Sequence, residues 1–139
     1  MHSPILAPLV ALVLWSFVMW AWLYATRIPA IVKAKIKFDP RQPVAEFQAL
    51  MPPEVRWKAD NYNHLMEQPT LFYAVTLALA LAGADGELNT GLAWAYVGIR
   101  IVHSLVQATV NIIPLRFGIF TVGSLVLLAM TVRAAMVVF

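Results

Sequence analysis

Long uncharged stretches are the feature that most constrains this chain. The first covers residues 5–26, and a helix of that length spans about 33 Å at roughly 1.5 Å per residue, enough to cross the hydrocarbon of a bilayer. Only 12% of the 139 residues are charged, whereas soluble domains carry roughly a quarter. The sequence therefore predicts an all-α membrane protein with a single domain.

Four membrane spans follow from the apolar segments, because prolines and charged residues separate them. We place the spans at about 5–27, 55–83, 88–112 and 116–138. A short helix is expected near residues 44–50, inside the proline-rich first loop. The prediction is one four-helix transmembrane bundle over residues 1–139.

Basic residues gather on the first loop and on the last turn, whereas the middle loop carries only Asp85 and Glu87. Because cytoplasmic loops are enriched in Lys and Arg, the first and third loops are expected in the cytoplasm and both termini outside. In a bacterium this means the inner membrane with periplasmic termini. The net charge of +3 is then a topology signal and indicates no nucleic-acid partner. The basic residues are Lys33, Lys35, Lys37, Arg41, Arg56, Lys58 and Arg116.

A polar stripe follows the second span at intervals of three or four residues. On a continuous helix its members share an arc of roughly 80°, and the apolar Leu65, Phe72 and Leu79 lie off that arc. Glu67 is the costly member, because a charge at mid-membrane costs about 2.5–3.5 kcal/mol unless it faces protein or water. His64 lies beside the arc, and it is either a lining or packing residue or a ligand-binding one. The stripe consists of Arg56, Asp60, Asn63, Glu67 and Thr70.

A second stripe follows the third span and consists of Arg100, His103, Ser104, Gln107 and Asn111. Arg100 and Glu67 lie at similar depths from the same membrane face, so we expect them to pair. Two readings remain open: a polar cleft that opens to the cytoplasm, or a sealed salt bridge that fixes helix register. Arg133, in the fourth span, is expected to reach the outer interface, and its replacement by Met to be nearly silent.

Two segments resemble the MAPEG family, the membrane-associated proteins in eicosanoid and glutathione metabolism, in a bacterial type. The segment from Arg56 through Asn63 and Glu67 to Pro69 is similar to the family's Arg…Asn…Glu…Pro signature. Arg100-Ile-Val-His103 is similar to its Arg-x-x-Tyr/His element. The resemblance covers nearly the whole chain.

The resemblance implies a homotrimer in which glutathione lies between protomers as a co-substrate, with no metal. It implies that Arg116 stabilises the glutathione thiolate as the catalytic residue. Two departures stand out: Met66 occupies the usual position of the acid, and Gln107 stands where glutathione-using members have tyrosine. The residues expected to bind substrate are Arg56, Asn63, Glu67, Arg100, His103 and Gln107.

Three functions remain open at this point. The first is a glutathione-dependent transferase or peroxidase that acts on apolar electrophiles or lipid hydroperoxides; its thiol must come from glutathione, because the chain has no cysteine. Arg56, Lys58, Arg100 and Arg116 would make its cleft attractive to anionic glutathione. The second is a non-catalytic protein of the same fold that binds lipid or serves as an accessory subunit. The third is a proton or ion path through Glu67, His64 and His103.

Overall fold

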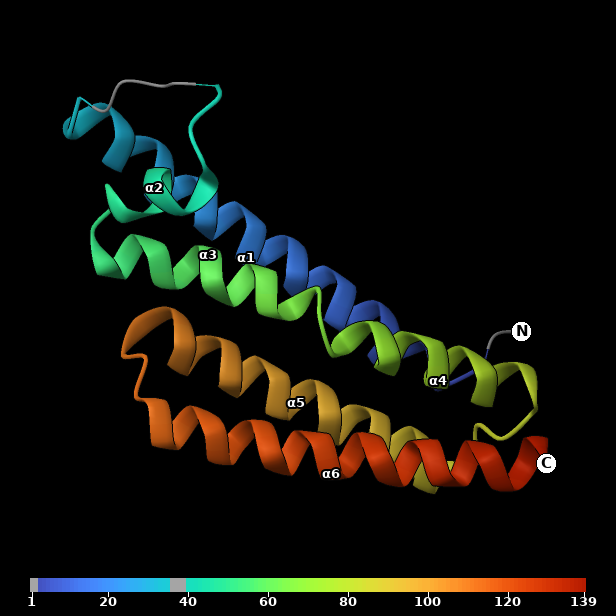
Figure 1. The fold of residues 1–139 in the computed structure, drawn as a ribbon. Helices are drawn as coiled ribbons and strands as arrows, with labels where there is room; N and C mark the ends of the chain where they lie inside the picture. Colours follow the sequence, from blue (N-terminus) through green and yellow to red (C-terminus); the bar gives the residue numbers. More distant parts are fainter. Residues whose placement is uncertain (1–2, 36–39) are drawn as a thin grey trace.

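The structure, a computed structural model, describes residues 3–35 and 40–139, and no described residue lies in a strand. Figure 1 shows the long helices side by side in an elongated bundle, with α3 and α4 following one another along one line. The described helices are α1 (Leu6–Lys33), α2 (Val44–Ala49), α3 (Pro53–Leu65), α4 (Pro69–Leu81), α5 (Glu87–Thr109) and α6 (Ile113–Val138).

Helix α5 is the centre of the bundle, because it packs against α1, α3 and α6. Helix α4 contacts α1 and α6. The beginning of α1 and the end of α6 lie at one end of the molecule, and α2 and the turn between α5 and α6 lie at the other (Figure 1).

The apolar core follows a seven-residue spacing. Leu65, Phe72 and Leu79 are fully buried, as expected from their position off the polar arc, and Leu12 and Met19 of α1 are buried at the same spacing. Such a repeat keeps one apolar stripe facing the neighbouring helix along its length. These residues therefore join α1 to the line of α3 and α4.

Within the described part of the chain, two helices are long and apolar enough to cross a membrane, α1 with 28 residues and α6 with 26. Helix α1 continues to Lys33, beyond the expected end near residue 27. The expected short helix after it is confirmed as α2. The guanidinium of Arg27 lies 5.3 Å from the ring centroid of Phe47, a cation–π contact that holds α2 against α1.

One continuous helix over residues 55–83 was expected, and this expectation is wrong, because α3 ends at Leu65 and α4 begins at Pro69. Proline has no N–H to give to the carbonyl four residues earlier, and its ring collides with that carbonyl. The chain closes tighter turns instead, with the N–H of Glu67 donating to the carbonyl of His64 at 3.1 Å. The break changes the direction in which residues 66–68 point.

Gln68, within this break, joins it to two other helices. Its Nε2 donates to Ser124 Oγ of α6 at 2.8 Å, and its Oε1 accepts from the Tyr96 hydroxyl of α5 at 3.0 Å. A side-chain amide can serve one donor and one acceptor at once. Gln68 thus ties the break to α5 and α6.

Arg133 was expected to extend to the outer membrane interface without a protein partner, but the structure shows a partner on another helix. Its Nε donates to Oδ1 of the buried Asn89 on α5, and Asn89 Nδ2 donates to the carbonyl of Ala84 at 2.8 Å. The expectation failed because a helical wheel of α6 shows only which positions face lipid or other helices. It cannot identify a partner residue on α5. Arg133 therefore links α6 to the start of α5.

Replacing Arg133 by Met should therefore destabilise the protein instead of being silent. The change leaves Asn89 Oδ1 buried without a donor, which costs about 1–3 kcal/mol. Thermal unfolding in detergent measures the effect, with Lys33→Met, at the exposed end of α1, as the matched control. Equal melting temperatures for the two variants would show that the link contributes nothing.

Candidate functional site

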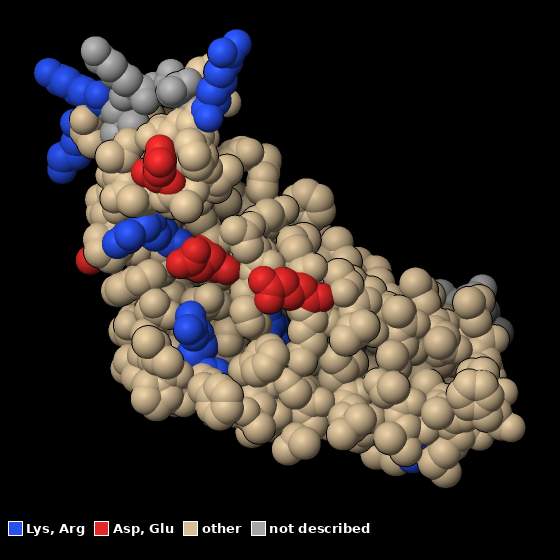
Figure 2. Space-filling view, in the orientation of Figure 1, with Lys and Arg blue, Asp and Glu red and all other residues tan. Residues whose placement is uncertain are grey.

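A polar cleft of about 520 Å³ lies between α3, α5 and α6. Figure 2 shows acidic and basic side chains around a hollow midway along this face, whereas the surface toward the chain ends is mostly uncharged. The single chain thus has an open polar cleft here, as the first of the two alternatives predicts. Its lining residues are Asp60, Asn63, His64, Glu67, His103, Gln107, Ile113, Arg116, Phe117 and Phe120.

The cleft has charges of opposite sign on its two side walls. Helix α3 and the break after it contribute Asp60 and Glu67, both exposed in the single chain. Helix α6 contributes Arg116 to the opposite wall. A ligand between these walls meets carboxylates on one side and a guanidinium on the other.

Arg116 is oriented by the turn that precedes its helix. Asn111 has a positive φ of 49°, a conformation that asparagine tolerates better than most residues, and its N–H donates to the carbonyl of Val106 at 2.7 Å. Its side-chain Oδ1 accepts from Arg116 Nη1 at 3.0 Å. Asn111 therefore lies in the turn, not inside a span ending near residue 112 as expected, and it holds the Arg116 guanidinium.

The floor of the cleft is made by polar residues of α5. His103 and Gln107 are 1% and 4% exposed, and Nδ1 of the first and Oε1 of the second have no hydrogen-bond partner among the described residues. Ser104 Oγ, fully buried beside them in sequence, has none either. Because buried polar atoms in folded proteins are normally paired, these atoms require water, a ligand or a second protein chain.

Arg100 is buried behind this floor and does not line the cleft. Its Nη2 lies 2.8 Å from Nδ1 of His64, and no ion pair joins it to Glu67. The expected direct pair of Arg100 and Glu67 is thus corrected. The physical reason is the break at Pro69, which directs Glu67 to the exposed wall and leaves His64, one turn earlier, to meet the guanidinium.

Five of the seven expected site residues line the cleft, and Arg56 and Arg100 do not. Lys58 does not line it either. Its Nζ donates to the carbonyl of Ala108 at 3.1 Å and lies 4.8 Å from the ring centroid of Trp22, so it joins α3 to α5 and α1. The residues that line it are Asn63, Glu67, His103, Gln107 and Arg116.

Sequence reasoning missed the aromatic wall of α6. Phe117 follows Arg116 directly and Phe120 lies about one helical turn after Arg116, and this pattern was the available signal. Phe120 contacts His64 edge-to-face, with ring centroids 5.3 Å apart. Among the described residues, no three His, Cys, Asp or Glu side chains gather as metal ligands would.

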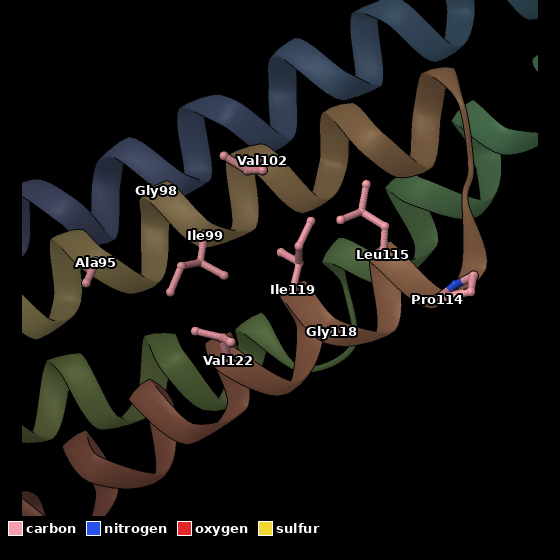
Figure 3. A pocket seen from close by; sticks show the side chains of 9 residues that line it. All are labelled: Ala95, Gly98, Ile99, Val102, Pro114, Leu115, Gly118, Ile119 and Val122. Carbon is pink, nitrogen blue, oxygen red and sulfur yellow. The ribbon is translucent and has the colours of Figure 1, made fainter.

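A larger hollow of about 780 Å³ lies between α5 and α6 (Figure 3). Gly98 and Gly118 contribute no side chains to it, and an added Cβ at either would meet no atom within 4 Å. The other lining residues are Ala95, Ile99, Val102, Pro114, Leu115, Ile119 and Val122. Because none of them carries a polar side chain, this hollow offers no chemistry and suits an apolar environment.

The sequence model of the MAPEG family matches residues 5–136 of the 139-residue chain. No curated protein and no solved structure matches the chain.

The contact between Arg100 and His64 makes a specific energetic prediction. In a double-mutant cycle, Arg100→Met and His64→Leu should couple by about 1–3 kcal/mol, because each removes the same hydrogen bond to an ionised group. Arg100→Met and Glu67→Gln should couple less strongly, because no ion pair joins these two side chains. Thermal or denaturant unfolding in detergent measures both cycles, and the reverse ranking would restore the pair of Arg100 and Glu67.

Proposed function

The chain belongs to the MAPEG family, and from this premise we propose that its polar cleft binds glutathione and that the protein is a glutathione-dependent transferase or peroxidase. The family and the two apolar helices make it a membrane protein. We further propose apolar electrophiles or lipid hydroperoxides as second substrates, which would reach the protein through the bilayer.

The opposite charges on the two walls of the cleft carry this proposal. Glutathione combines one ammonium with two carboxylates, so it needs acids and a cation held apart. Asp60 and Glu67 suit the ammonium, and Arg116 suits a carboxylate or the thiolate. The cleft volume of about 520 Å³ is within the usual range for small-molecule sites.

The unpartnered atoms of the floor support the same ligand. Gln107 on the floor and Asn63 on the α3 wall carry amide groups that match the peptide bonds of glutathione. When bound, glutathione would supply the thiol that this cysteine-free chain lacks. The Arg116 guanidinium, anchored by Asn111, would favour the thiolate by placing a positive charge beside it.

We propose that α3 with α4, and α5, form two more spans beside α1 and α6. The break shortens both halves of one, and the polar residues of α5 lower the hydropathy of the other, so neither is as apolar as α1 or α6. The basic loop would lie in the cytoplasm and the termini in the bacterial periplasm.

A homotrimer would solve the problem that the exposed acids create. Asp60, Asn63 and Glu67 are exposed in the single chain. At mid-membrane, where the sequence pattern places Glu67, lipid contact would cost a charge about 2.5–3.5 kcal/mol. A neighbouring copy over this face would cover them and complete the site. We therefore propose that the cleft lies between protomers.

A second candidate is a non-catalytic protein that binds lipid or serves as an accessory subunit. The observation that favours it is the position of Arg100, which lies behind the cleft instead of in it. Of the four cations expected in the cleft, only Arg116 remains to stabilise a thiolate. A protein that binds its ligand without catalysis needs no cations to stabilise a thiolate.

Glutathione binding to the purified protein separates the two candidates. Equilibrium dialysis with labelled glutathione should show saturable binding to the wild type. Arg116→Gln should weaken this binding about tenfold or more, because it removes one hydrogen bond between ionised groups. Asp60→Asn should weaken it less, because a neutral amide still offers an oxygen, and Lys33→Gln, remote from the cleft, serves as the control.

The outcomes are distinct. Binding with turnover of an apolar electrophile supports the enzyme, and binding without turnover supports the non-catalytic protein. Wild-type protein that binds no glutathione would remove the proposed ligand. Binding that survives Arg116→Gln unchanged would move the ligand out of this cleft.

A further inference from the structure

The contact between Arg100 and His64 determines which nitrogen of the histidine carries its proton. A guanidinium has only donors, so the His64 Nδ1 that lies 2.8 Å from Arg100 Nη2 must accept. An imidazole whose Nδ1 accepts is neutral and carries its hydrogen on Nε2. His64 is therefore a hydrogen-bond donor at the far edge of its ring.

That far edge is the part of the ring available to the cleft. Arg100 is 1% exposed and lies outside the cleft lining, whereas His64 is half-buried and lines it. With Nδ1 turned toward the buried arginine, Nε2 is the polar atom of His64 that remains for a ligand.

The ring of His64 is held in place by two aromatic neighbours. It stacks on His103 with centroids 4.9 Å apart and planes 20° from parallel, and Phe120 packs edge-to-face against it. A ring restrained by stacking and by a hydrogen bond keeps its free N–H in one direction. The donor is therefore preorganised before any ligand arrives.

We propose that His64 binds the ligand of the cleft through its Nε2–H and that Arg100 is a positioning residue that acts through His64. The group that His64 recognises is an acceptor, a carboxylate or carbonyl oxygen, on the same ligand whose anionic part faces Arg116. Its identity as part of glutathione rests on the function proposed above. The arrangement differs from the direct role that the family resemblance implies for Arg100.

The tautomer tests the arrangement without any ligand. In protein labelled with nitrogen-15 histidine, NMR should show His64 as a neutral ring with hydrogen on Nε2 and none on Nδ1. His64→Gln identifies the resonance by its loss, and Arg100→Met should release the constraint and populate the other tautomer. A proton on Nδ1 of His64 in the wild type would overturn the proposal.

Glutathione then tests the ligand contact. Saturating glutathione should shift the Nε2–H resonance, and His64→Phe should weaken binding about tenfold, whereas His64→Gln, whose amide keeps an N–H near the position of Nε2, should weaken it less. Arg100→Met alone should weaken glutathione binding. When it is combined with His64→Phe, it should weaken binding no further than His64→Phe alone.

Each result has one meaning. A further loss from Arg100→Met in the His64→Phe background shows that Arg100 contacts the ligand itself and contradicts the positioning role. Bound glutathione that leaves the His64 resonance unmoved contradicts the contact. If wild-type protein binds no glutathione, the proposed function fails, and the tautomer alone decides whether Arg100 positions His64.

Discussion

The burial of one guanidinium inside an apolar helical bundle is the constraint on which the rest of the structure depends. Arg100 is 1% exposed on the helix that contacts three others, and a charge at such a site needs an acceptor that is itself held in place. His64 supplies the acceptor from α3. This bond brings the polar face of α3 against the polar face of α5, and the cleft forms where the two faces part toward α6.

Other polar contacts between helices secure the same arrangement. Lys58 bonds to the end of α5, Gln68 bonds to α5 and α6, and Asn111 holds Arg116 at the start of α6. In a membrane the hydrophobic effect does not drive helices together, because lipid tails are as apolar as the helix surfaces. Polar contacts between helices therefore have a larger part in determining which helices pack together. The apolar hollow between α5 and α6, by contrast, has no polar contact across it.

Much of the helical layout could be predicted from sequence, because it follows from periodicity. The apolar runs, the short helix after the first loop and the buried positions of Leu65, Phe72 and Leu79 are all properties of a local pattern. The partner of Arg100 could not be predicted in this way. A helical wheel assumes a continuous helix, and Pro69 ends that continuity two residues after Glu67, so the residue that the wheel placed opposite Arg100 faces the open wall. Pro69 itself was the sequence signal of the break.

The functional meaning of the cleft depends on whether water reaches it within the membrane. The absence of cysteine allows a direct measurement, in which single cysteines are introduced at Asn63, in the cleft, and at Val102, in the apolar hollow. We expect a charged, membrane-impermeant thiol reagent to modify Asn63→Cys when it is added on the side of the basic loop, and to leave Val102→Cys unmodified. Asn63→Cys that stays as unreactive as Val102→Cys from both sides would show that the cleft is sealed and would contradict this account.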